Sequence, residues 1–197
     1  MLQKQGKVIV LPMKIREKPG KEEEKIPMKK VFCLLLTLCL MLPLFAMADD
    51  AIVIGQTDYA AHGTKCFAVL TVAVQGDKIV AAYIDEFQFM DAATAQGVPN
   101  SDADFGKSYP EGKVLASKKT NAALYSENMK KAGSTVALDV NYAAIEEFVT
   151  GKTIAELEAA IEGKTAEEMV DAVSGCTLVD TLGYVKGLLE AAKSVAK

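Results

Sequence analysis

The residues best suited to chemistry lie near the end of the chain, in the segment Asp171–Thr177, which reads Asp-Ala-Val-Ser-Gly-Cys-Thr. Gly175 permits a tight turn without a side chain that would block a ligand, and Thr177 places a hydroxyl beside that turn. Apolar residues then recur at helical spacing from Leu178, so we expect a helix to begin there. Because a helix start offers free N–H groups and the positive end of its dipole, this segment is predicted to hold a phosphate-bearing cofactor.

A helix cap is the alternative role for Thr177. The pattern Gly-x-Thr-x-x-acid occurs three times, at Gly151/Thr153/Glu156, Gly163/Thr165/Glu168 and Gly175/Thr177/Asp180. Each copy is typical of a helix N-terminus, and on local grounds alone capping is the favoured interpretation of Thr177. Only the third copy has an acid and a serine upstream, at Asp171 and Ser174, so a ligand remains open there.

The same segment resembles the flavin-attachment motif of the FMN-binding domain family, Asp-x-x-Ser-Gly-Ala-Thr, with Cys176 in place of the usual alanine. That family includes the flavin-bearing subunits of sodium-pumping NADH:quinone oxidoreductase and of Rnf complexes, and this chain resembles its stand-alone secreted members. The likeness covers most of residues 51–195, including the turn Gly76–Ile79. It implies an α+β fold in which a small antiparallel sheet packs against C-terminal helices.

The resemblance also implies a cofactor and a loading reaction. Thr177 would carry FMN covalently through a phosphoester. The implied cofactor-binding residues are Thr177, Asp171, Ser174, Gly175, Cys176 and Leu178. A separate flavin transferase that uses FAD and a divalent metal would attach the FMN and recognise the motif. The loaded protein would exchange electrons with redox donor and acceptor proteins or quinones, as a carrier more than as a catalyst.

Two other functions remain open from the sequence. The first is a secreted, non-enzymatic binding module that holds flavin non-covalently or not at all, with Thr177 only as a cap. The second is a flavin-dependent reductase, which would need NAD(P)H, although the body of the chain has no pyridine-nucleotide fingerprint.

The charge distribution argues against a nucleic-acid partner. The chain has a net charge of −4, and most of its acidic residues lie after the first 48 residues, which are rich in Lys and Arg. The remaining domain is therefore strongly acidic and would repel polyanions. It also lacks the basic stripe or interleaved aromatic and basic residues of a nucleic-acid surface.

The N-terminal part has the pattern of an export signal. Lys29 and Lys30 precede the apolar run Val31–Phe45, and the small residues of Ala46–Ala48 follow, which predicts cleavage before Asp49. Because the run is shorter than the roughly 20 residues of a membrane span, removal is favoured over an uncleaved anchor. The mature protein is then expected outside the cytoplasm, in the periplasm or at the cell surface.

The sequence thus divides into three parts. Residues 1–27 form a polar extension, and one hypothesis is that translation begins at Met28. Residues 28–48 are the predicted signal peptide. Residues 49–197 are predicted to fold as one FMN-binding-like domain, which is long enough to bury a sizeable core.

Within this domain, strands are expected first and helices later. The predicted strands are 51–54, 66–74 and 79–84, with 89 as an alternative end for the last one. A hairpin turn is expected at Gln75–Lys78 and a long loop over 91–112. The predicted helices are 120–132, 142–149, 154–161, 166–172 and 178–196. An apolar stripe on the last helix is expected to pack on the sheet.

A few further side chains have a functional and a structural interpretation. Cys66 and Cys176 could form a disulfide or stay as two buried thiols, and both alternatives remain open.

Lys118 and Lys119 could reach a flavin, but solvated lysines are the commoner case. Tyr125, Phe87 and Phe89 could stack on the flavin ring, but core packing is favoured. His62 is expected in a surface turn, and Asp85 and Glu86 should point to opposite faces of a strand.

Overall fold

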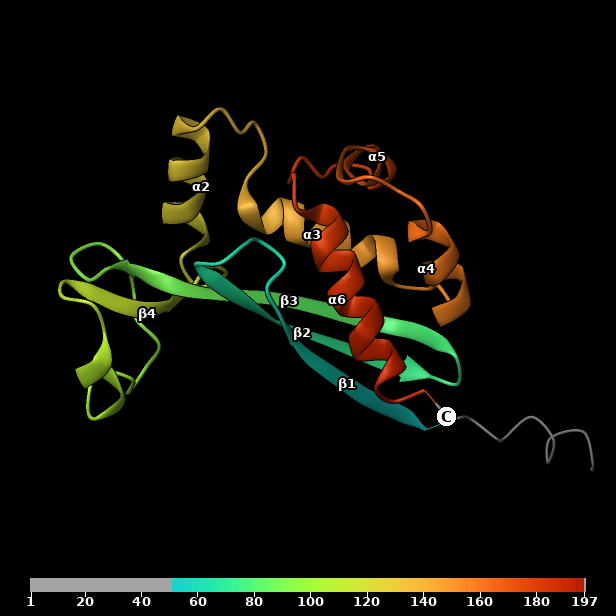
Figure 1. The fold of residues 1–197 in the computed structure, drawn as a ribbon, viewed down its shortest axis with the longest axis horizontal. Coiled ribbons are helices and arrows are strands. Elements are labelled where there is room, and N and C mark those ends of the chain that lie inside the picture. The colour runs from blue at the N-terminus through green and yellow to red at the C-terminus, as the bar shows by residue number, and fades with distance from the viewer. Residues whose placement is uncertain (1–50, 197) are drawn as a thin grey trace, which may run out of the picture. The chain divides into compact units, whose positions relative to one another are not determined.

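The computed structural model describes residues 51–196, so the predicted extension and signal peptide lie outside the described residues. This part of the chain is an α+β domain with a four-stranded antiparallel sheet in the order β1-β2-β3-β4 (Figure 1). The strands are β1 Ile52–Tyr59, β2 Cys66–Gln75, β3 Lys78–Asp91 and β4 Lys113–Ser117. The predicted α+β class with an antiparallel sheet is therefore confirmed.

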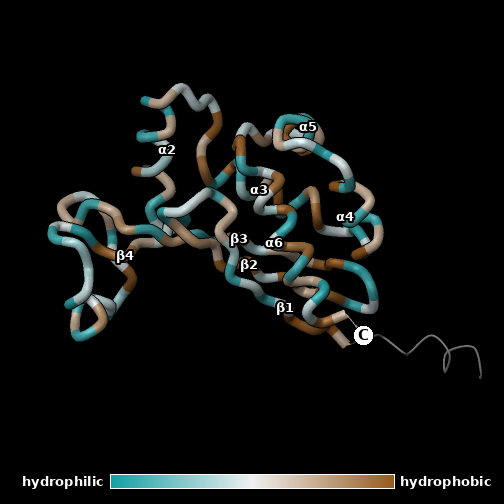
Figure 2. The backbone as a smooth tube through the Cα atoms, in the orientation of Figure 1, coloured by the Kyte–Doolittle hydropathy of each residue, from teal (hydrophilic) through white to brown (hydrophobic). Residues whose placement is uncertain are grey.

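The predicted β-hairpin is formed by β2 and β3. Gln75 pairs with Lys78 across the turn, and Gly76 has a φ of 63°, a conformation that glycine adopts without strain. Figure 2 shows hydrophilic residues at this turn. A register shift opposite Ala73 and Val74 leaves Val80 without a partner, which marks a bulge in β3. Both β1 and β3 are longer than predicted, because pairing with β2 extends them into sequence that is not strongly apolar.

Strand β4 was missed by the sequence prediction. It follows the predicted loop, which contains only a short 3-10 helix, η1 Phe105–Ser108, and it pairs with Phe87–Asp91 at the end of β3. The N–H of Ala92 donates to the carbonyl of Gly112 at 2.9 Å and brings the two ends of the loop together. This strand has five residues, so long-range pairing rather than a local pattern determines it.

Five α-helices follow the sheet in the described chain. They are α2 Ala122–Lys131, α3 Leu138–Val149, α4 Ile154–Ile161, α5 Ala166–Ala172 and α6 Thr181–Lys193. Helices α4 and α5 have the predicted bounds, because Thr153 and Thr165 each form a complete capping box. Helix α3 begins four residues earlier than predicted, and α6 begins three residues later.

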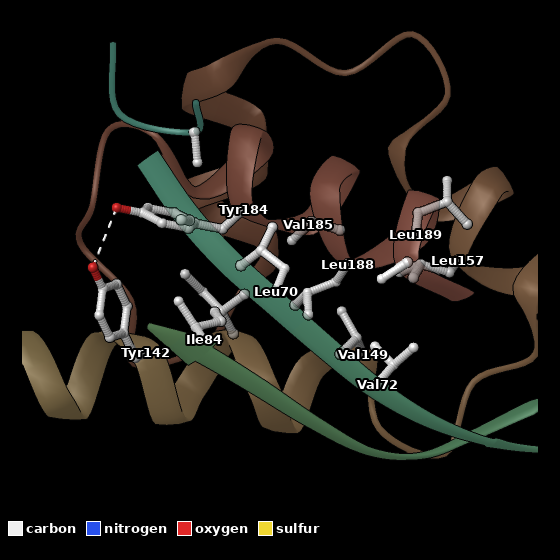
Figure 3. Close-up of a cluster of buried hydrophobic side chains, with 14 of the residues drawn as sticks. Leu70, Val72, Ile84, Tyr142, Val149, Leu157, Tyr184, Val185, Leu188 and Leu189 are labelled. Atoms are coloured by element: carbon white, nitrogen blue, oxygen red, sulfur yellow. Dashed lines mark hydrogen bonds between the residues drawn. The ribbon is translucent and has the colours of Figure 1, made fainter. Parts of the chain in front are cut away.

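The hydrophobic core lies between one face of the sheet and the helices. The core contains Leu70 and Val72 of β2 and Ile84 of β3, which lie against Val185 and Leu188 of α6 (Figure 3). Helix α3 packs beside α6 and contacts β3 on the same face of the sheet. Helix α6 contacts β1 and β2 as well as α3, α4 and α5, so it is the central helix of this layer. The prediction that the last helix packs on the sheet is confirmed.

Small residues allow α6 to lie very close to the sheet. A Cβ atom added at Gly55 of β1 would lie 2.0 Å from the carbonyl oxygen of Ala191, and one added at Gly187 would lie 2.1 Å from Leu70 Cδ1. The backbone contact at Gly55 leaves no room for a side chain, and a side chain at Gly187 would require Leu70 to move. Gly55 and Gly187 therefore determine how closely the helix and the sheet approach.

Side chains on the other face of the sheet are largely exposed. Phe67, Tyr83 and Phe89 are 43%, 50% and 44% exposed. In Figure 1, helices α3, α4, α5 and α6 all lie on one side of the sheet. Within residues 51–196, no helix is both long and apolar enough to traverse a bilayer.

Candidate functional site

The predicted site lies in the connection between α5 and α6. Helix α5 ends at Ala172, and Ser174 and Gly175 form a turn in which the Cys176 N–H donates to the carbonyl of Val173 at 3.1 Å. Gly175 has a φ of 86°, which a residue with a side chain rarely adopts. The sequence prediction of a glycine-dependent turn is therefore confirmed, and this turn carries the chain directly to Thr177.

Thr177 does not cap a helix. Helix α6 begins at Thr181 and has Asp180 at its N-cap position, so Thr177 lies outside the helix. The Thr181 hydroxyl donates to the carbonyl of Leu178 at 2.6 Å, and this bond closes a separate turn before the helix. The interpretation of Thr177 as an N-cap is wrong, and so is the expectation that a helix start at Leu178 presents its N–H groups to a ligand on Thr177.

The three Gly-x-Thr copies therefore differ in structure. The hydroxyls of Thr153 and Thr165 accept hydrogen bonds from the N–H groups of Glu156 and Glu168, at 3.1 and 3.2 Å. The carboxylate of Asp180 instead pairs with the imidazole of His62, and it makes no capping bond. His62 is exposed and lies in a turn, as predicted.

Thr177 is exposed and is held through one buried side chain. Its N–H donates to Oδ1 of Asn141 at 2.7 Å, and its hydroxyl lies 3.4 Å from the same oxygen. Asn141 is in the first turn of α3 and is fully buried. Thr177 is thus an exposed residue whose backbone is held by a buried side chain.

A groove of about 390 Å³ lies beside Thr177, between α5 and the segment that leads to α6. Its lining residues are Ala166, Glu167, Val170, Asp171, Thr177 and Val179. This volume falls within the range of roughly 300–1,000 Å³ that is usual for small-molecule sites. One wall is apolar, and Glu167 and Asp171 contribute carboxylates.

The six predicted site residues do not all have the same role. Asp171 and Thr177 line the groove. Ser174 and Gly175 are exposed in the turn, whereas Leu178 is half-buried and packs against the core. Cys176 is buried, with its Sγ 3.0 Å from the Thr181 hydroxyl. The structure therefore brings Asp171 and Thr177 together at one groove and uses Cys176 and Leu178 to anchor the segment.

Cys66 and Cys176 are both buried, and no disulfide joins them. Cys66 lies instead near Lys118, with its Sγ 3.7 Å from the ammonium, and near the carbonyl of His62 at 3.3 Å. Burial raises the pKa of the Cys66 thiol to about 11, although the Lys118 charge opposes this shift. Of the two alternatives left open by the sequence, two buried thiols are therefore correct.

Neither proposed role of Lys118 is correct. It is not solvated, because its side chain is 1% exposed, and its ammonium pairs with the buried Glu86 instead of reaching the groove. Burial disfavours the charged form of Lys118, but the Glu86 carboxylate outweighs this effect and raises the lysine pKa. Tyr184 donates to the same Glu86 oxygen at 3.0 Å. Glu86 thus joins the sheet to α6.

The remaining candidates lie away from the groove lining. Lys119 bonds Glu146 at 2.7 Å and lies over the Tyr83 ring. Asp85 accepts a bond from Ser117, so it does not share the partners of Glu86. Phe87 stacks on Phe67, Phe89 contacts Tyr109, and Tyr125 packs on the core.

Among residues 51–196 no group of three or more His, Cys, Asp and Glu side chains could hold a metal ion.

No family model, curated protein or solved structure matches the chain significantly.

Asn141 is the residue of this site that the sequence prediction missed. A signal for it exists in α3, where the buried residues Leu138, Tyr142, Ile145 and Val149 form one apolar stripe. Asn141 lies on that stripe, and a polar residue on a buried stripe must have a hydrogen-bond partner. The sequence indicates such a partner is needed, but it does not indicate that the partner is Thr177.

Proposed function

We propose that this chain is an exported flavoprotein of the FMN-binding type that carries FMN on Thr177 through a phosphoester and transfers electrons outside the cytoplasm. The observation that supports it most is the position of Thr177, which is an exposed residue at the edge of a groove and caps no helix. It belongs to the one Gly-x-Thr copy that has the complete Asp-x-x-Ser-Gly-x-Thr pattern.

Loading is a group transfer to the threonine. Thr177 Oγ forms a bond to the phosphorus on the FMN side of FAD, the bridging P–O bond of FAD breaks, AMP leaves, and the hydroxyl proton passes to a base of the transferase. Such an enzyme, with its divalent metal, is a required partner. The accessible turn Ser174–Gly175 and the exposed Asp171 are the features it would contact.

The groove supports a role in holding the flavin after loading. Ala166, Val170 and Val179 provide an apolar surface on which a flat ring can pack, and Thr177 lies at its border. Glu167 and Asp171 would repel a phosphate placed deep in the groove, so the solvent-exposed border is the favourable position for the phosphoester. When bound, FMN supplies one- and two-electron chemistry, and the protein supplies its position.

The test is co-expression of the chain with and without a flavin transferase, followed by denaturation and intact-mass measurement. We expect one added FMN, less one water, on the peptide that contains Thr177, and none without the transferase. Thr177→Ala should abolish the added mass and change stability by less than about 0.5 kcal/mol, because the residue is exposed and its hydroxyl makes only the 3.4 Å contact.

Thr153→Ala is the matched control. It removes the corresponding hydroxyl of another Gly-x-Thr copy, which caps α4. We expect it to load fully with FMN and to lose about 1 kcal/mol of stability. If Thr177→Ala protein still gains the FMN mass, or if wild-type protein gains none, the proposed covalent carrier is wrong.

The same experiment separates the other two functions. A binding module would release its flavin on denaturation, whereas a covalent carrier retains it. A flavin-dependent reductase would turn over with NAD(P)H and a small acceptor in the absence of any partner protein.

A further inference from the structure

We propose that Asn141 positions Thr177 for the attachment of FMN. This inference rests on the proposed function, because it concerns the preparation of the same acceptor hydroxyl. Asn141 would not touch the flavin, so it is a positioning residue and not a catalytic one.

The hydrogen bonds of Asn141 determine which way its amide points. Nδ2 donates to the carbonyls of Val136 and Ala137, at 3.2 and 2.8 Å. Both amide hydrogens of Asn141 are therefore bonded to backbone carbonyls just before α3. Oδ1 must then face the other way, where it meets the N–H of Thr177 at 2.7 Å.

Asn141 itself is on a rigid element. The next residue, Tyr142, is fully buried, and its hydroxyl lies 3.4 Å from that of Tyr184 (Figure 3). The same hydroxyl lies 3.5 Å from the Glu86 carboxylate. The N–H of Leu138, at the start of the same helix, donates to the Ser126 hydroxyl at 2.9 Å. These bonds fix the first turn of α3 to the sheet, to α6 and to α2.

Within the described chain, Thr177 itself has no buried contact on the segment that carries it, although Cys176 and Leu178 on either side are anchored. Ser174, Gly175 and Thr177 are exposed, and the bond from the Thr177 N–H to Asn141 ties the acceptor residue to α3. A group held on a rigid element reacts faster than one that must first be ordered.

The Thr177 hydroxyl oxygen lies 3.4 Å from Asn141 Oδ1, a longer contact than the bond from the Thr177 N–H. Its proton can therefore pass to the transferase base when the oxygen bonds to phosphorus. Asn141 thus fixes the backbone of the acceptor and leaves the hydroxyl able to react.

The experiment measures initial loading rates by intact mass, with purified transferase and FAD, at a temperature at which every variant is folded. Asn141→Ala removes the acceptor oxygen, and we expect its loading to slow by about tenfold or more, because small misplacements of a reacting group cost about this much or more. Ile145→Val is the control, since it removes one buried methyl from the same helix and lowers stability without changing the Asn141–Thr177 bonds. Its loading rate should equal that of the wild type.

Asn141→Asp distinguishes positioning from stability. The aspartate keeps an oxygen for the Thr177 N–H, but it places a second oxygen against the carbonyls of Val136 and Ala137, so it should be less stable than wild type. We expect Asn141→Asp to load faster than Asn141→Ala, even where it is the less stable of the two. A purely structural role predicts that loading follows stability.

Amide hydrogen exchange of the unloaded protein provides a readout that does not depend on the transferase. Asn141→Ala should accelerate exchange at the Thr177 amide by a larger factor than at the amide of Leu157 in the core, whose exchange follows the loss of global stability. Unchanged exchange at Thr177, or wild-type loading of Asn141→Ala, overturns the inference while the proposed function stands. A wild-type protein that never loads overturns the proposed function and this inference with it.

Discussion

The buried pair of Lys118 and Glu86 offers the sharpest test of the fold, through the variant Lys118→Met. Both side chains are almost completely buried, at 1% and 0% exposure. Methionine keeps much of the lysine volume but leaves the Glu86 carboxylate without its cation, and Oε1 of Glu86 already has no hydrogen-bond partner among the described residues. We expect the free energy of unfolding to fall by about 3–5 kcal/mol, which is typical when one partner of a buried pair is removed.

This loss is large against a total stability of about 5–15 kcal/mol for a domain. It corresponds to a fall in Tm of about 6–20 °C for a domain of this size. The assay is urea denaturation followed by far-ultraviolet circular dichroism, with the slope of the transition checked for two-state behaviour. Lys107→Met is the matched control, because Lys107 pairs with Asp104 at the surface, and it should cost less than about 1 kcal/mol.

The double variant Lys118→Met/Glu86→Gln removes both charges. The buried, unpaired Glu86 carboxylate causes most of the fall in the free energy of unfolding. The double variant should therefore be more stable than Lys118→Met alone by about 1–3 kcal/mol. A buried ion pair is refuted if Lys118→Met costs no more than Lys107→Met, or if the two buried substitutions destabilise the protein additively.

The pair also predicts a dependence on alkaline pH. The pKa of Lys118 is raised in the folded protein, since the Glu86 charge outweighs the effect of burial, so the pair contributes fully below the unfolded pKa of about 10.4. Its contribution is lost as pH rises through the folded pKa. Burial also raises the pKa of the hydroxyls of Tyr142 and Tyr184, which adds to the fall in stability above about pH 10.

Two further predictions concern packing and the thiols. Gly55→Ala should lower the free energy of unfolding by about 1–3 kcal/mol, because its Cβ would meet the Ala191 carbonyl at 2.0 Å. In the same denaturation assay, Gln56→Ala at the exposed neighbouring position should change the free energy of unfolding by less than about 0.5 kcal/mol. Equal stability of the two variants would show that α6 does not lie this close to β1. Cys66 and Cys176 should resist alkylation in the folded protein and react fully once it is unfolded without reductant, since both are buried and the Cys66 pKa is raised to about 11. Labelling that requires a reductant would reveal a disulfide and contradict this arrangement.

Local signals in the sequence were sufficient for much of the fold. The β2–β3 turn contains Gly76, which adopts a positive φ, so the hairpin follows from neighbouring residues. The bounds of α4 and α5 follow from Thr153 and Thr165, whose capping partners lie three residues away. These features were predicted correctly because each depends on a few consecutive residues.

Features that depend on distant residues were not predicted. Strand β4 exists because it pairs with the end of β3, and its own five residues carry little pattern. Lys118, which follows β4, was expected in solvent. Glu86 of β3 instead provides a buried partner whose charge offsets the desolvation of the lysine.

The candidate site likewise combines features set by local sequence with features set by tertiary packing. The sequence by itself determined the glycine turn at Gly175, the acid and serine before it and the hydroxyl after it, because these are properties of one short segment. Only the tertiary structure decided that Thr177 is free of the helix, that it borders a groove, and that Asn141, 36 residues away in the chain, holds it. The physical reason is that a hydrogen bond or a groove between elements requires them to be packed together, and no local pattern specifies which distant side chain will lie there.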